Sequence, residues 1–226
     1  MTTLWLVRHA LPLAPDGQTP SQVCYGHTDW PADATLTRQA AAKLAVALAA
    51  QPHRHHHVVL RCSPLLRCLQ LAQALQAVLP ASQLTVDSRL AEMHFGQWEG
   101  VAWNDIPRHE LDAWATDFAH CPVGHSGETV HAFVQRVGQA AHDTLTDRHT
   151  QATNAHPLPG RPETKHTTTV WVTHAGVIRA MHWLGRSAQT GQLLRAQAPA
   201  QASMWPTFAP GYGQWCHWQP PGEVAA

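Results

Sequence analysis

Two histidines and two arginines stand where predicted buried strands end. Arg8 and His9 directly follow one apolar run, and His174 follows a β-branched run. Arg67 lies one turn in from the start of a helix predicted just after a third run. Functional residues of open α/β sheets gather at the carboxyl ends of the strands. We therefore expect these four side chains to converge at one edge of a sheet.

Such a set of residues is suited to phosphoryl chemistry. Arginine presents a planar fork of donors to phosphate oxygens, and a neutral imidazole such as that of His9 is a competent nucleophile. The leaving alkoxide needs a proton, which Glu92 or Glu99 in the loop at residues 89–100 could deliver. Because arginines supply the positive charge, no metal and no other cofactor is expected.

The run His55-His56-His57 lies in a polar turn. Three adjacent imidazoles on a loop point in different directions, and nothing nearby supplies a fixed fourth ligand. We therefore do not expect a metal site there.

Alternating strand and helix patterns predict the scaffold that would place these residues. They favour a three-layer α/β/α sandwich with a mainly parallel mixed sheet. The predicted strands cover residues 4–7, 58–60, 84–86 and 168–172, and the predicted helices cover 35–50, a stretch from Pro64, about 103–118, about 127–147 and 177–184. The first two helices are expected to bury Leu36, Ala40, Leu44 and Leu48, and Leu65, Leu69, Ala72 and Leu75.

Several segments lack helical periodicity. The long loop at residues 11–35 follows the Arg-His pair and could cover the same crevice. Residues 149–167 are expected to form an exposed insertion. The aromatic runs at 203–208 and 214–218 predict an edge hairpin, which could be a dimer edge or the end of the sheet. One domain is expected over residues 1–226, with its core at about 1–185 and the hairpin at about 200–220.

Composition narrows the class of protein. The 226 residues carry 15 basic and 15 acidic side chains, so nothing favours a nucleic-acid or membrane-surface partner. Five cysteines without a regular spacing indicate reduced thiols. No signal peptide or bilayer-spanning run is visible, so we expect a cytoplasmic protein.

The motifs resemble those of the histidine phosphatase superfamily, which has a phosphoglycerate mutase-like fold. Leu6-Val7-Arg8-His9 is similar to its amino-terminal signature, and Ser63-Pro64-Leu65-Leu66-Arg67 to its second arginine element. Residues 90–100, LAEMHFGQWEG, resemble the segment that holds its acid. Gly127-Glu128-Thr129 with Phe133 and Arg136, and Val172 to Arg179 around His174, resemble its last two motifs.

The resemblance implies a role for each residue. His9 would be the phosphorylated nucleophile and Glu92 the acid and base, with Glu99 as the alternative. Arg8, Arg67 and His174 would bind the phosphoryl oxygens. Further phosphate or substrate contacts would come from Ala175, Tyr25 and His27, whereas Glu128 and Arg61 would support the structure.

Departures from the family pattern limit the activities that the resemblance implies. Ala10, Leu11 and Pro15 replace a Gly, a Glu and an Asn that many members carry, which argues against a mutase. The segment Cys24 to Asp29 resembles one typical of alpha-ribazole phosphatases. The resemblance therefore implies a small phosphorylated metabolite as partner, with alpha-ribazole 5′-phosphate as the expected substrate. A broad-specificity small-molecule or sugar phosphatase, a mutase-like transferase and a non-catalytic phospho-ligand binder are the alternatives.

Overall fold

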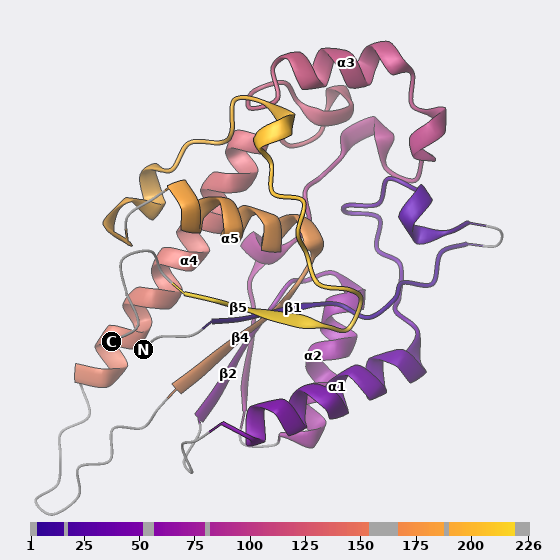
Figure 1. Cartoon of the computed structure of the whole chain (residues 1–226). Helices are drawn as coiled ribbons and strands as arrows, with labels where there is room; N and C mark the ends of the chain where they lie inside the picture. The colour runs from indigo at the N-terminus through magenta and orange to yellow at the C-terminus, as the bar shows by residue number, and fades with distance from the viewer. Residues whose placement is uncertain are drawn as a thin grey trace, which may run out of the picture.

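In the computed structural model, one mixed sheet lies between two layers of helices (Figure 1). The structure describes residues 4–15, 18–51, 57–79, 82–153, 167–187 and 190–219. Within these ranges the strand order is β3-β2-β4-β1-β5, and only β5 is antiparallel to its neighbour. The strands are β1 (Leu4–Arg8), β2 (His57–Cys62), β3 (Gln83–Val86), β4 (Thr167–Thr173) and β5 (Trp215–Trp218). The predicted α/β sandwich with a mainly parallel sheet is confirmed.

Helices cover both faces of the sheet. Two helices, α1 (Ala34–Ala49) and α2 (Leu66–Val78), pack together on one face, and α4 (Val130–Thr153) and α5 (Ala175–Ser187) pack together on the other (Figure 1). The short helix α3 (Arg108–Thr116) lies apart from the sheet, at the top of the view (Figure 1).

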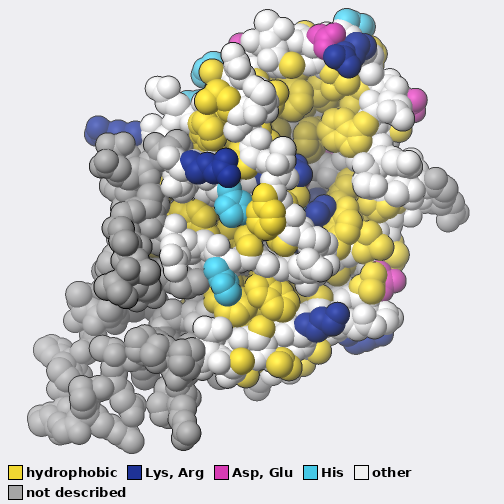
Figure 2. Space-filling model, viewed as in Figure 1, with side chains coloured by type: hydrophobic (Ala, Val, Ile, Leu, Met, Phe, Trp, Pro, Cys, Tyr) yellow, Lys and Arg dark blue, Asp and Glu magenta, His cyan; other side chains and the backbone are white. Residues whose placement is uncertain are grey.

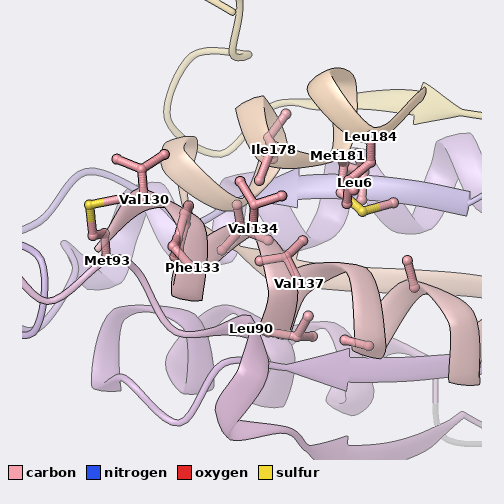
Figure 3. Packing of buried hydrophobic residues seen from close by; sticks show 14 of the residues in the cluster. Leu6, Leu90, Met93, Val130, Phe133, Val134, Val137, Ile178, Met181 and Leu184 are labelled. Carbon is pink, nitrogen blue, oxygen red and sulfur yellow. The ribbon is translucent and has the colours of Figure 1, made fainter. Parts of the chain in front are cut away.

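Strand β1 shows why the sheet is buried on both sides. Its side chains alternate between faces, so Leu6 joins the cluster under α4 and α5 while Val7 joins the cluster under α1 and α2. Figure 3 shows the first cluster, which contains Leu6 of β1 together with residues of both helices. Fully burying a side chain of this size contributes about 1.5–3 kcal/mol, so the strand that carries Arg8 is firmly fixed.

Two predicted elements are wrong in extent or type. Residues 203–208 form no strand: Ala202–Met204 is a 3₁₀ turn, and β5 pairs with β1 instead of with a hairpin partner. Pro206 lacks the N–H that a strand ladder needs. The helix predicted from residue 103 begins only at Arg108, because Pro107 disfavours helical backbone in the residue before it.

The predicted inner faces of the first two helices are partly wrong. Leu36 is 41% exposed, because it lies at the margin of the apolar stripe of α1 and Thr37 takes the inward position. Leu65 and Leu69 are only half-buried. The buried side of α2 is rotated so that it includes Arg67, Cys68, Leu71, Ala72 and Leu75.

Some predicted segments lie partly or wholly outside the residues that the structure describes. Residues 52–56, with His55 and His56, lie outside them, as do residues 154–166 of the expected insertion. Helix α4 runs on to Thr153, beyond its predicted end near residue 147. All five cysteines are free thiols, as expected. No helix in the described part of the chain combines the length and apolar character needed to span a bilayer.

Candidate active site

Parallel pairing of β1 with β4 brings the two predicted site histidines together. Arg8 is opposite Thr173 in the register, so His9 and His174 leave the sheet side by side. The His9 N–H donates to the Thr173 carbonyl at 3.0 Å, and the two imidazole centroids lie 5.1 Å apart. Both side chains are buried, with exposed fractions of 2% and 0%.

A single hydrogen bond sets the tautomer of His9. Nδ1 lies 2.7 Å from the carbonyl oxygen of Ala10, and because a carbonyl only accepts, Nδ1 must carry the proton. Burial and the nearby Arg67 charge hold the pKa of His9 well below its usual value. The ring is therefore neutral near pH 7, with the Nε2 lone pair available for attack.

His174 is held by one neighbour from the turn after β2 and one from helix α2. Its Nε2 lies 2.7 Å from the Ser63 hydroxyl oxygen and 3.3 Å from the Cys68 sulfur. Burial lowers the pKa of this imidazole strongly, and the positive charge of Arg67 lowers it further. Ser63 and Cys68 thus orient a neutral second imidazole beside the first.

Arg67 is a fully buried cation in the first turn of α2. It donates from Nη1 to the Thr28 carbonyl at 2.9 Å and from Nη2 to the Gly26 carbonyl at 2.6 Å. The Nε atom is buried and has no hydrogen-bond partner among the described residues. Each terminal nitrogen carries two N–H groups, so donors remain for an anion. The long loop predicted to shape the crevice is thereby attached to Arg67.

Arg8 is positioned by Tyr212, a residue that sequence reasoning missed. The Arg8 guanidinium carbon lies 3.9 Å from the Tyr212 ring centroid, and Nη1 donates to the Pro210 carbonyl at 3.2 Å. The Tyr212 hydroxyl is 2.8 Å from that of Tyr25. The flanking Gly211 and Gly213, in a segment otherwise rich in bulky residues, were the available signal for a special loop.

The two candidate acids differ sharply in their surroundings. Glu92 accepts one hydrogen bond on each oxygen, from the N–H groups of Met93 and Gly176, both at 3.0 Å. Gly176 lies in the first turn of α5, immediately after His174 and Ala175. The Glu92 carboxyl group is therefore tied to the strand end that carries the second histidine, and it lines a cavity described below.

Glu99 instead fastens the loop. Its two oxygens accept hydrogen bonds from the N–H groups of Gly26, His27, Thr28 and Phe95 and from the Thr28 hydroxyl, at 2.5–3.0 Å. Burial would raise the pKa of this carboxyl, but these hydrogen bonds together lower it. A carboxylate so fully occupied is poorly placed to exchange a proton with a substrate.

Arg136 was noted in the sequence only as part of a motif, yet it holds the backbone around Glu92. It makes a paired contact with Glu128 at 2.7 and 2.9 Å. Its Nη1 donates to the carbonyls of Arg89 and Ala91, and its Nη2 to that of Glu92, at 2.7–3.0 Å. Glu128 thus has the supporting position that the resemblance implied. Arg61 also has structural contacts, forming ion pairs with Asp87 and Asp147.

The remaining predicted contacts divide into two groups. Tyr25 and Ala175 line the same cavity as Arg8 and Glu92. The His27 side chain does not line it; its Nε2 is 2.9 Å from the Glu92 carbonyl oxygen, to which it must donate. His27 therefore supports the backbone of the predicted acid.

A cavity of about 500 Å³ opens beside the strand ends. Figure 2 shows a hollow in this face, with basic side chains within it and hydrophobic side chains around it. Arg8, Glu92 and Arg179 give the cavity its charged groups. Most of its wall is apolar and aromatic, from Tyr25, Met93, Phe95, Trp103, Trp114, Phe118, Phe133, Trp205 and Tyr212. Trp103, Trp114, Phe118 and Trp205 lie outside the motifs, so no motif pointed to them.

Comparison with known proteins agrees with this geometry. The chain matches the profile of the histidine phosphatase superfamily, branch 1, over residues 4–215. It belongs to that superfamily. Membership supports phosphoric monoester hydrolase activity. None of the curated proteins matches the chain significantly.

Solved structures of other proteins share the fold. A mycobacterial glucosyl-3-phosphoglycerate phosphatase is 20% identical with a TM-score of 0.64, and the match covers 96% of this chain and 90% of that one. A protein named as a candidate alpha-ribazole-5′-P phosphatase from Escherichia coli is 23% identical with a TM-score of 0.66, covering 96% and 89%. The Thermus thermophilus protein TTHB049 is 26% identical with a TM-score of 0.51, covering 88% of each chain.

Proposed function

We propose that this protein is a phosphomonoesterase that acts through a phosphohistidine at His9, with alpha-ribazole 5′-phosphate as its substrate. The observation that carries the proposal is the tautomer of His9. The Ala10 carbonyl holds the proton on Nδ1, which leaves Nε2 as a neutral nucleophile in a buried cationic site.

In the first step, Arg8 and Arg67, with His174 oriented by Ser63, bind the phosphoryl oxygens. Nε2 of His9 attacks phosphorus while the bond from phosphorus to the ester oxygen breaks. The guanidinium groups offset the charge that spreads over the phosphoryl oxygens. Protonated Glu92 gives its proton to the departing oxygen, which leaves as an alcohol.

In the second step, the Glu92 carboxylate takes a proton from water, and the resulting hydroxyl attacks phosphorus. The phosphorus–nitrogen bond breaks and inorganic phosphate leaves, so His9 is neutral again and Glu92 is protonated. Positive charge comes from the arginines throughout, so we expect turnover to continue when a chelator is present.

The cavity supports the choice of substrate. Alpha-ribazole 5′-phosphate joins a phosphorylated ribose to a fused aromatic base. The apolar aromatic wall, which includes Trp103, Trp114 and Phe118, suits such a base. A sugar acid offers little apolar surface to this wall. The aromatic lining therefore favours an aromatic substrate over a sugar phosphate.

Trapping the intermediate tests the mechanism. Rapid acid-free quenching with radiolabelled substrate should leave acid-labile phosphate on the protein, and His9→Ala should abolish it. His109→Ala, at an exposed position on α3, is the control and should label normally. Labelling that persists in His9→Ala would refute the assignment.

A substrate panel tests the specificity. Alpha-ribazole 5′-phosphate, ribose 5-phosphate, 3-phosphoglycerate, glucosyl-3-phosphoglycerate and p-nitrophenyl phosphate should be compared by kcat/KM. We expect alpha-ribazole 5′-phosphate to give the highest kcat/KM. Equal rates would indicate a broad-specificity phosphatase, phosphate migration on 3-phosphoglycerate would indicate a mutase, and binding without turnover would indicate a phospho-ligand binder.

Leaving-group dependence tests the acid. Glu92→Gln should slow hydrolysis of alkyl phosphates far more than that of p-nitrophenyl phosphate, because nitrophenolate leaves without a proton. If Glu99→Gln shows this pattern and Glu92→Gln does not, the acid is Glu99.

A further inference from the structure

Arg179 is a cation of the cavity wall to which the proposed mechanism assigns no task. It lies on α5, is half-buried, and lines the cavity together with Arg8 and Glu92. Its Nε atom is buried and without a hydrogen-bond partner, and no described residue accepts a hydrogen bond from its guanidinium. The side chain therefore has donors directed toward no protein acceptor in the described chain.

This arrangement costs free energy unless a ligand completes it. Burial lowers the pKa of the Arg179 guanidinium, while the nearby Glu92 carboxylate acts in the opposite direction and Arg8 lowers it further. Partly desolvated donors without acceptors are unfavourable, and proteins normally satisfy them. An oxygen atom of a bound ligand would do so.

The position of Arg179 indicates which part of the substrate it would meet. Glu92 accepts a hydrogen bond from Gly176, so the departing ester oxygen must come close to the start of α5. Arg179 is three residues later on the same helix, about 4.5 Å along the axis. Its side chain would thus meet the alcohol half of the substrate within a few atoms of the ester oxygen.

Building on the phosphatase function, we propose that Arg179 binds hydroxyl oxygens of the sugar next to the scissile phosphate. The sugar next to the phosphate in the proposed substrate carries neutral hydroxyl oxygens, which can accept hydrogen bonds from the Arg179 guanidinium at this side of the cavity. The aromatic part of the wall then holds the base. Arg179 is in this way a specificity-determining residue. It favours phosphate esters whose leaving alcohol carries sugar hydroxyls over esters whose leaving group is an aromatic ring without hydroxyls.

The kinetic test compares substrates with and without sugar hydroxyls. Arg179→Gln should lower kcat/KM for alpha-ribazole 5′-phosphate about tenfold or more, since a hydrogen bond to a charged group is lost. Hydrolysis of p-nitrophenyl phosphate, whose leaving group has no hydroxyls, should change less than about twofold. Arg179→Lys should recover part of the loss. Arg186→Gln, at an exposed position farther along α5, is the control and should match the wild type.

A binding test separates this inference from the proposed function. Alpha-ribazole 5′-phosphate is titrated calorimetrically into His9→Ala and into the His9→Ala/Arg179→Gln double variant. Weaker binding by the double variant supports the contact between Arg179 and the sugar hydroxyls. If the wild type at the same time hydrolyses nothing, only the phosphatase proposal fails. Equal binding overturns the inference. An equal loss of activity on both substrates also overturns it, as does a loss confined to 3-phosphoglycerate, which would assign Arg179 to a carboxylate.

Discussion

Replacing Arg136 with methionine should destabilise the fold and misplace the acid at the same time. Arg136 and Glu128 are 20% and 17% exposed, so methionine leaves a largely buried carboxylate without its partner. Removing one member of a buried ion pair costs about 3–5 kcal/mol. Because this pair keeps some exposure, we expect a loss of about 3 kcal/mol in the free energy of unfolding.

The same change should reduce catalysis through Glu92. The carbonyls of Arg89, Ala91 and Glu92 lose their common donor, so the backbone that carries the carboxyl group can shift. A displacement of about 1 Å in a reacting group can cost about 100-fold in rate. We therefore expect kcat for alkyl phosphates to fall about 100-fold, with a smaller loss on p-nitrophenyl phosphate.

Urea unfolding and steady-state kinetics measure the two effects separately. Arg136→Lys retains the charge but cannot reproduce the paired contact, so it should fall between the wild type and Arg136→Met. The Glu128→Gln/Arg136→Met double variant should recover part of the stability, because no buried charge is left alone. If Arg136→Met has the same urea midpoint as the wild type, the stabilising role of the Arg136–Glu128 pair is refuted. An equal loss on good and poor leaving groups would refute the link to Glu92.

Three further changes test other parts of the site. Gly26→Ala would place a Cβ atom 1.8 Å from the Met93 carbonyl oxygen, so the melting temperature and activity should both drop. Glu99→Gln removes the charge that binds the loop at residues 26–28 and should make that loop more susceptible to limited proteolysis than in the wild type; unchanged cleavage would contradict this role. Folding lowers the pKa values of His9 and His174 below the usual 6.5, so the unfolded chain takes up protons first on acidification. Stability should be full above pH 6.5 and fall as the pH drops toward the folded-state values, and a urea midpoint that stays constant from pH 7.5 to 5.5 would contradict this.

Strand ends were the most predictable part of the site. A short apolar run followed by Arg8-His9, and another followed by His174, locate residues at the edge of a parallel sheet without any knowledge of side-chain contacts. The fold followed for the same reason, because strand and helix periods alternate along the chain. A short stretch of sequence was therefore sufficient to predict the position of a residue that is set by the strand or helix around it.

Residues whose contacts are distant in the sequence could not be predicted from such short patterns. Arg136 reaches backbone carbonyls more than forty positions away, and Tyr212 covers Arg8 from the far end of the sequence. The run around Trp205 has the aromatic content of a strand, yet Trp205 packs near Phe118 and Phe133 beside the cavity. Tertiary packing decided its conformation, and no short window of sequence contains that information.

The pairing of β1 also has a consequence for how the protein is made. The first strand bonds only to β4 and β5 among the described strands, and those partners begin at Thr167 and Trp215. While the ribosome synthesises the chain, β1 gains a neighbour only after synthesis has passed Thr167, the first residue of β4. Such distant pairing slows folding and leaves an apolar segment open to association with other chains. The nascent chain is thus vulnerable at β1, and a chaperone that binds exposed apolar segments could protect these residues until β4 has been synthesised.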